Sequence, residues 1–276
     1  MILIGERING MFTDVKQAIA EKNKRVIQEL AKKQTEAGAT YLDVNVGTAA
    51  ADQEGTMQWL VETIQSADGG CSTPLCLDSQ KPNVMAAGLK VINAENGVIL
   101  NSTPLNKKTD DVILDKYIEM ANQAGPKSSI IALTMDKNGV PQDVDTRVAI
   151  AAEIVSKAME KGYDAQRLFI DPIVLPVKVP NAQIQPTNIL AAMDQIKMLC
   201  DPPPHITVGL SNLSQGATER SLINRVFLAM AISRGLGSAI VDVLDQKLMD
   251  VVATSEMLMN KQIYSDSFLK IYRAAN

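Results

Sequence analysis

Carboxylate and amide side chains recur where short apolar runs end along this sequence, and this repetition is its strongest chemical signal. The residues at or just after the ends of the runs include Glu6, Asn45, Asp78, Asn101, Asp136, Asp171, Asn212 and Asp242. A carboxylate accepts pairs of N–H donors, whereas a side-chain amide both donates and accepts. If these side chains converge, they favour recognition of a flat heterocycle that carries amino and oxo groups. The candidates for hydrogen bonding to the edge of this heterocycle are Asp78, Asn101 and Asp171.

An Asp or Asn at such a position also commonly caps the following helix or closes a turn. That explanation suffices for any one position. It is less satisfactory for eight positions that face one cleft, because converging polar groups are costly unless a ligand or water satisfies them. We therefore expect these residues to form a binding site for a small polar molecule.

Other kinds of site have little support in the sequence. Cys71, Cys76 and Cys200 form neither a C-x-x-C pair nor a Cys/His cluster, which argues against catalytic zinc and a disulfide framework. The single histidine, His205, starts an apolar run, so we expect it to be structural, and Cys76 to be a core residue. No G-x-x-x-x-G-K phosphate loop occurs. We predict no metal site and no Cys/His nucleophile.

The elements that position the polar residues follow from hydrophobic periodicity. Eight apolar, β-branched runs predict strands at Ile2–Gly5, Tyr41–Val46, Leu75–Leu77, Gly97–Leu100, Ser129–Met135, Leu168–Ile170, Ile206–Leu210 and Ser238–Val241. Segments with helical spacing separate them, for example Met57, Leu60, Val61 and Ile64, and Val148, Ala151, Ala152 and Val155. Helix starts are indicated by Pro82, Thr109 and Asp145, and helix ends by Gly38, Gly125 and Gly162.

Strands that alternate with helices and are apolar on both faces indicate a parallel sheet covered by helices. The 276 residues divide into eight units of about 34 residues each, which suits an α/β protein built as a single (β/α)8 TIM barrel over residues 1–276. An open doubly wound sheet is the alternative, but no G-x-G-x-x-G follows the first strand and eight units are many for it. In such a barrel, the strand ends that carry the polar residues build the active site.

Charge and hydropathy limit the partners and the location. The 27 Lys and Arg against 31 Asp and Glu give a net charge of −4, which is unsuited to binding nucleic acid. The N-terminus lacks the pattern of a signal peptide, and the longest apolar run, at 226–232, is too short for a membrane span. We expect a cytoplasmic protein without nucleic-acid or membrane partners.

The motifs, taken together, resemble a known family. They are GERING at 5–10, DVNVG at 43–47, CLDS at 76–79, NST at 101–103, DP at 171–172, GLSN at 209–212 and SQ at 214–215. In this order they are similar to those of the pterin-binding methyltransferases. The likeness is greatest to methyltetrahydrofolate:corrinoid protein methyltransferases and to the folate module of cobalamin-dependent methionine synthase. It covers essentially the whole chain.

The resemblance implies a pterin site and roles for individual residues. Asp78, Asn101 and Asp171 would hold the pterin ring, with Glu6 and Asn45 as further binding residues. The remaining binding residues would be Gly209 and Ser211, which shape the loop of Asn212, and Gln215 and Arg220, which reach the pterin or its p-aminobenzoyl part. Asn212 would approach N5, the nitrogen that carries the methyl group. Asp78 or Asp171 would relay a proton through water, because no suitable histidine is present.

The resemblance also implies the reaction and its partner. A methyl group would move, in either direction, between N5 of 5-methyltetrahydrofolate or tetrahydrofolate and the cobalt of cobalamin or another corrinoid. Family members that bind the corrinoid carry a D-x-H-x-x-G motif on a separate domain, and this sequence lacks that motif. A separate corrinoid protein is therefore expected to dock at the barrel mouth. Homodimerisation is expected from the likeness alone.

Two other functions compete with this interpretation. Dihydropteroate synthase shares the barrel and the pterin pocket, but it has a Ser-Arg-Lys stretch after strand seven and a glycine-rich loop after strand six. Here the corresponding residues are Ser211-Asn212-Leu213 and Asp171-Pro172-Ile173, without the basic residues. The second competitor is a non-catalytic scaffold that binds folate or docks a corrinoid protein. The presence of Asn212 argues against it.

Overall fold

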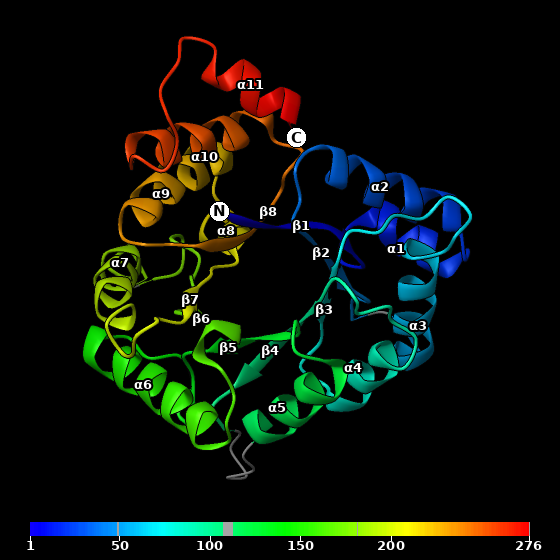
Figure 1. Cartoon of the computed structure of the whole chain (residues 1–276), viewed down its shortest axis with the longest axis horizontal. Helices are drawn as coiled ribbons and strands as arrows, with labels where there is room; N and C mark the ends of the chain where they lie inside the picture. Colours follow the sequence, from blue (N-terminus) through cyan, green and yellow to red (C-terminus); the bar gives the residue numbers. More distant parts are fainter. Residues whose placement is uncertain (49, 107–112, 181, 276) are drawn as a thin grey trace.

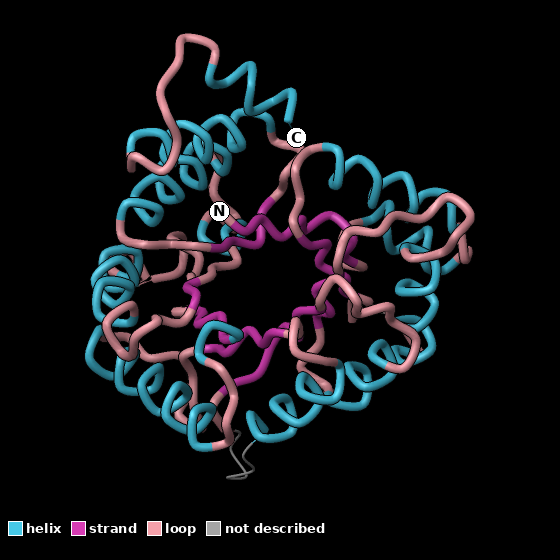
Figure 2. The backbone as a smooth tube through the Cα atoms, in the orientation of Figure 1, coloured by secondary structure: helices cyan, strands magenta, loops and turns pink. Residues whose placement is uncertain are grey.

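The computed structural model describes residues 1–48, 50–106, 113–180 and 182–275. Eight parallel strands pair in the order β7-β6-β5-β4-β3-β2-β1-β8. They are β1 (Ile2–Asn9), β2 (Tyr41–Asn45), β3 (Leu75–Asp78), β4 (Val98–Pro104), β5 (Ser129–Leu133), β6 (Leu168–Asp171), β7 (His205–Ile206) and β8 (Ser238–Val241). A bridge from Gly209 to Ile240 links the segment after β7 to β8, and the strands form the central ring in Figure 2. The predicted (β/α)8 barrel is confirmed, and the open sheet is excluded.

Helices surround this ring (Figure 1); most cover its outside, whereas the short helix at Leu210–Leu213 lies against the last strand and the helix at Phe268–Ala275 packs on the helix before it. They are α1 (Thr13–Ala20), α2 (Lys24–Glu36), α3 (Gln53–Ile64), α4 (Pro82–Leu89), α5 (Ile113–Ala124), α6 (Val144–Glu160), η1 (Ala165–Arg167), α7 (Gln185–Ile196), α8 (Leu210–Leu213), α9 (Arg220–Ser233), α10 (Gln246–Leu258) and α11 (Phe268–Ala275). Each long helix buries an apolar stripe on the strands, as Met57, Leu60, Val61 and Ile64 do in α3. No helix in the described ranges is long and apolar enough to cross a membrane.

The inside of the ring has an apolar layer below a polar one. Ile4, Cys76, Ile99, Ile131 and Phe169 form a buried cluster within the barrel. Successive side chains of a strand point to opposite faces, so the residue two positions further along points into the ring again. That position is occupied by Glu6, Asp78, Asn101, Leu133 and Asp171, respectively. The polar layer therefore lies at the carboxyl ends of the strands.

Several boundaries differ from the sequence predictions. β1 continues to Asn9 and β4 to Pro104, because polar inward-facing residues continue both strands. β7 is shorter than expected, and Leu210 begins a short helix instead of ending a strand. Asp145 is not an N-cap, because it already lies in the first turn of α6. Asp143 caps that helix by accepting a hydrogen bond from the Thr146 backbone N–H at 2.7 Å.

The other helix signals are largely confirmed. Pro82 occupies the first turn of α4. Gly38, Gly125 and Gly162 have positive φ angles just beyond the ends of α2, α5 and α6, where a left-handed residue is required. Thr109, the other predicted N-cap, lies outside the described residues.

A candidate site at the barrel mouth

Polar residues from four neighbouring strands lie in one row across the mouth. Asn9 of β1 pairs with Asn45 of β2, Asn45 with Asp78 of β3, and Asp78 with Asn101 of β4. The row forms because the strands are parallel and end at the same edge. The Asn45 side-chain amide donates to a carboxylate oxygen of Asp78 at 2.6 Å. Asn45, Asp78 and Asn101, which the sequence predicted as binding residues, are thus neighbours.

Asp43 lies one layer below this row, and the sequence analysis did not select it. It is 2% exposed and accepts a hydrogen bond from the Asn101 side-chain amide at 3.0 Å. Burial, together with the negative charge of Asp78, raises its pKa well above the ordinary value. Its position two residues before Asn45 in a predicted strand is the signal that would have identified it, because both side chains then point inward.

Both acids at the row have pKa values above the ordinary range. Burial raises the pKa of Asp78 to about 6, and the hydrogen bond from Asn45 limits the rise. Asp43 and Asp78 therefore share a poorly solvated region where ionising both is unfavourable. A ligand that brings N–H donors to this region would stabilise the ionised form.

Asp171 ends β6 on another part of the mouth. It is buried, and its Oδ1 accepts a hydrogen bond from the Ile173 backbone N–H at 2.7 Å. Ile173 has a φ of 61°, a left-handed conformation that is unfavourable for a β-branched residue and is often found near functional sites. Burial raises the pKa of Asp171 to about 7, while the positive charge of Arg147 acts in the opposite direction.

Glu6 connects β1 to the short helix α8. Its carboxylate accepts a hydrogen bond from the Ser211 hydroxyl at 2.7 Å. Burial raises the pKa of Glu6, the Ser211 hydrogen bond lowers it, and the negative charge of Asp242 raises it. This contact fixes Ser211, one of the residues predicted to shape the loop of Asn212.

Asn212 lies on α8 with an exposed side chain, while its neighbours Leu210 and Leu213 are buried and anchor the helix. Gly209 precedes the helix, and a Cβ atom there would lie 2.9 Å from the Asn212 side-chain nitrogen. The glycine therefore leaves space for the Asn212 amide above the end of the barrel. The exposed amide is free to meet a ligand at the mouth.

The segment after β7 is held from two sides. Arg220 donates to the Ser211 carbonyl at 3.1 Å and to the Ser214 hydroxyl at 3.2 Å, so it supports the loop that carries Asn212. From the connection between β6 and α7, the Val177 backbone N–H donates to the Leu213 carbonyl at 2.9 Å, and the Lys178 ammonium to the Gly216 carbonyl at 3.0 Å. Gln215 is exposed.

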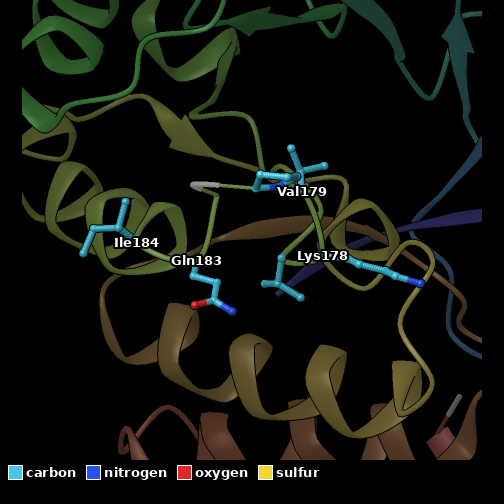
Figure 3. A pocket seen from close by; sticks show the side chains of 6 residues that line it. Lys178, Val179, Gln183 and Ile184 are labelled. Atoms are coloured by element: carbon cyan, nitrogen blue, oxygen red, sulfur yellow. The ribbon is translucent and has the colours of Figure 1, made fainter.

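Two pockets lie in this part of the molecule. One, of about 480 Å³, is lined by Glu6, Ser211, Asn212 and Arg220 among others, so four predicted residues share it. The other, of about 740 Å³, is open and is lined by residues 177–180, 183 and 184 of one connection. Figure 3 shows Lys178 and Ile184 at opposite ends of that surface. Neither pocket is lined by Asn45, Asp78 or Asn101, which lie side by side at the ends of β2, β3 and β4. Asp171 lies at the end of β6 and lines neither pocket.

His205 and Cys76 lie where the sequence predicted. His205 starts β7, its ring stacks on Phe169 at 4.7 Å between centroids, and burial lowers its pKa. Cys76 is fully buried in the barrel, where burial and the nearby Asp43 raise the pKa of its thiol. Within the described ranges, no group of three or more His, Cys, Asp or Glu residues is arranged to hold a metal ion.

Comparisons with known proteins agree with this geometry. Residues 11–242 match the pterin binding enzyme family. A methylcorrinoid:tetrahydrofolate methyltransferase of Eubacterium limosum is 31% identical over 273 residues, which cover 99% of this chain and 96% of that protein. The methionine synthase of Mycobacterium leprae is 27% identical over 248 residues, which cover 87% of this chain and 20% of that protein.

Solved structures share the fold. Yersinia pestis dihydropteroate synthase with a pterine-sulfa conjugate superimposes with a TM-score of 0.66 at 13% identity, covering 95% of this chain and 94% of that one. The Thermus thermophilus enzyme gives a TM-score of 0.59 at 16% identity, covering 90% and 91%. At such identities the likeness concerns the barrel alone. From the family match and the near full-length relative, we conclude that the chain belongs to the pterin-binding enzymes.

Proposed function

We propose that this protein is a methyltransferase that moves a methyl group between N5 of (methyl)tetrahydrofolate and the cobalt of a corrinoid carried by a separate protein. The observation that carries the proposal is the 31% identity to a methylcorrinoid:tetrahydrofolate methyltransferase across almost the whole of both chains. The polar layer at the mouth is the structural counterpart, since it offers carboxylates and amides to a flat amino-oxo ring.

In this proposal Asp78, Asn101 and Asp171 bind the pterin ring. The ring presents N–H groups and a carbonyl along one edge, and these suit carboxylate acceptors and an amide that both donates and accepts. Burial makes ionised Asp78 and Asp171 unfavourable in the free protein, as their raised pKa values indicate. N–H donors from a ligand would offset that cost. Glu6, Asn45, Gly209, Ser211, Gln215 and Arg220 complete or support the site.

Asn212 acts on the reacting nitrogen. A methyl group on a neutral tertiary amine is a poor electrophile, because the leaving nitrogen would be very basic, so N5 must gain positive character in the transition state. A hydrogen bond that strengthens as this charge develops lowers the barrier by roughly 3 kcal/mol. Asn212 suits this role because its exposed amide lies on a helix anchored by Leu210 and Leu213.

Asp78 or Asp171 supplies the proton that N5 requires, through an ordered water. A group transfers protons most efficiently when its pKa lies near the working pH. The values of about 6 and about 7 for these two acids support this role. His205 lies at the opposite end of β7 and takes no part.

The remaining expectations concern assembly and location. We infer that a separate corrinoid protein docks at the mouth, that the methyltransferase acts as a homodimer, and that it works in the cytoplasm. The corrinoid supplies the metal that accepts or donates the methyl group. Sedimentation of the purified protein tests the dimer, and a species of monomer mass at working concentrations would contradict it.

One assay tests the reaction. The protein is mixed with 5-methyltetrahydrofolate and a Co(I) corrinoid, and the cobalt absorption is followed. The reverse mixture contains a methylcorrinoid and tetrahydrofolate. Methyl transfer in either direction supports the proposal. Condensation of a pterin pyrophosphate with p-aminobenzoate would indicate a dihydropteroate synthase, and folate binding without any turnover would indicate a scaffold.

A further inference from the structure

Arg147 is a fully buried arginine in the first turn of α6, beside the strand that carries Asp171. Its Nε donates to the Pro172 carbonyl at 2.9 Å. Its Nη2 donates to the Pro141 carbonyl at 2.7 Å and to the Gln185 side-chain oxygen at 2.9 Å, and its Nη1 donates to the Asp143 carbonyl at 3.3 Å. One guanidinium thus joins the β5–α6 connection, α6, the residue after β6, and α7.

This placement is electrostatically unfavourable for α6 itself. A helix N-terminus carries partial positive charge, so a cation in the first turn is repelled there. All four acceptors around Arg147 are neutral oxygens. Burying a charge is costly unless another charge compensates it. Its hydrogen bonds therefore leave the charge of Arg147 without a direct ionic partner, and the carboxylates of Asp143 and Asp171 offset it only through charge.

Of these two carboxylates, only Asp171 is also a predicted binding residue at the mouth. Arg147 holds the carbonyl of Pro172, the residue that directly follows Asp171, so the guanidinium fixes the backbone from which this carboxylate projects. The two groups also interact through charge, and each favours the ionised form of the other. Both the hydrogen bond to the Pro172 carbonyl and the charge interaction therefore connect Arg147 to Asp171.

Arg147 is the charged group that acts on Asp171 from the elements packed around it. From β5, the paired residue is Leu133, and Thr134 donates its backbone N–H to the Asp171 carbonyl at 2.9 Å. On the β7 side, Ile170, the residue before Asp171, pairs with the apolar Ile206. The residue of α7 that contacts Arg147 is Gln185, which is neutral. Asp143 is exposed; it accepts a hydrogen bond from Arg147 through its backbone carbonyl, and its carboxylate charge also favours the charged guanidinium.

We propose that Arg147 is a positioning residue for pterin binding, which holds the backbone beside Asp171 in place and favours the ionised form of its carboxylate, the form that accepts N–H donors from the ring. This inference rests on the proposed function. A protonated Asp171 would lose acceptor capacity on the edge that the pterin contacts. Arg147 would thus act on the substrate through Asp171, without touching it.

The test measures 5-methyltetrahydrofolate affinity by calorimetry between about pH 5.5 and pH 8.5. In the parent, affinity rises with pH as Asp171 ionises, and D171N removes that part of the profile. In Arg147→Gln the loss of the positive charge moves the rise to higher pH by about one unit. Affinity near pH 7 then falls by about fivefold and recovers at the upper end of the range. Arg147→Lys, which keeps the charge, leaves the rise close to its parental position.

A second variant separates charge from geometry. Gln185→Glu keeps an acceptor on Arg147 but neutralises its charge, so it should move the rise to higher pH while the arginine stays in place. Gln185→Glu also tests the charge effect if the Arg147→Gln variant fails to fold. An unshifted profile in Gln185→Glu would contradict the electrostatic part of the proposal.

Arg167 is the matched control, because it also donates to backbone carbonyls, namely those of Ser128, Ala121 and Gly125, but at the opposite end of β6. Arg167→Gln should lower thermal stability without shifting the pH profile. If Arg147→Gln and Arg167→Gln gave the same unshifted profile, Arg147 would be a structural residue only. If the parent protein failed to bind 5-methyltetrahydrofolate at any pH, the proposed function would fail instead.

Discussion

Asn212 concentrates the chemistry of the proposed reaction in one side chain. Replacing it with alanine should lower methyl transfer by one to a few powers of ten, each worth about 1.4 kcal/mol in the barrier. Folate binding should remain, because the acids of the polar layer are unchanged. Stopped-flow measurement of the cobalt absorption, with calorimetry for binding, checks both expectations.

The control for this prediction is Asn96→Ala. Asn96 is exposed and precedes β4, so it lies at the opposite end of the barrel. The Asn96→Ala variant should transfer methyl groups at the parental rate. An Asn212→Ala variant that also kept the parental rate would show that the role assigned to this amide is wrong.

Asp78 makes stability depend on pH in a direction that follows from its burial. Its pKa is about 6 in the folded protein against an ordinary value of 3.8, so the folded state binds more protons between these values. Stability from this group is therefore present at low pH and lost as pH rises through about 6. Asp78→Asn should be more stable than the parent by about 3 kcal/mol near pH 8 and show no gain near pH 4.

Urea unfolding at the two pH values measures this difference. Asp68→Asn, which alters an exposed aspartate, should leave stability nearly unchanged at both. The Asp78 variant should bind folate more weakly, since stability gained at a functional site commonly lowers function. Equal stability of Asp78→Asn and the parent near pH 8 would contradict the burial argument.

At the scale of elements, α8 and the glycine before it decide where Asn212 lies. Gly209 has a φ of −80°, which any residue can adopt, so alanine would cause no backbone strain there. The added Cβ would instead meet the Asn212 side-chain nitrogen at 2.9 Å and displace it. Gly209→Ala should lower methyl transfer by about tenfold, with unfolding stability changed by less than about 0.5 kcal/mol.

Gly88→Ala should have the opposite effect to Gly209→Ala, lowering stability but not the rate of methyl transfer. Its Cβ would lie 2.9 Å from side-chain atoms of Leu77 and Met57, inside the packed layer between α3, α4 and β3. Such overpacking costs about 1–3 kcal/mol of stability. The rate below the melting temperature should be unchanged. If Gly209→Ala lost stability and kept its rate, the two glycines would have been assigned the wrong roles.

The sequence predicted the number, type and order of the strands, because each strand is a short apolar run between turn residues. It missed the ends of β1 and β4, because Glu6 and Asn101 are polar residues that face into the barrel and continue their strands. Asp43 was missed because it lies inside a predicted strand, whereas the sequence analysis selected polar residues at strand ends. Arg147 could not be recognised, because its spacing on α6 is that of an ordinary buried position and its partners come from three other segments.

For the whole molecule, ligand binding should be visible as stabilisation. A ligand that binds only the folded state at about 100 times its Kd adds about 2.7 kcal/mol, which corresponds to about 5–10 °C in Tm for a chain of this size. We expect 5-methyltetrahydrofolate to give such a shift in the parent. Asp171→Ala should show a smaller shift at the same ligand concentration, because folate binding is weakened.

Differential scanning fluorimetry across a ligand series measures both proteins. p-Aminobenzoylglutamate, which lacks the pterin ring, should shift neither of them appreciably. An equal shift in the parent and in Asp171→Ala would place the ring away from β6.

The apolar layer of Ile4, Cys76, Ile99, Ile131 and Phe169 acts as a floor beneath the polar residues. A flat ring that rests on this floor cannot sink further into the barrel, so its reactive edge stays at the rim. In the proposed reaction, a bulky carrier protein would then bring its metal to the rim from outside, without a tunnel and without opening the barrel. If the proposed function is correct, such a shallow site would let one small molecule react with a metal that a second protein carries.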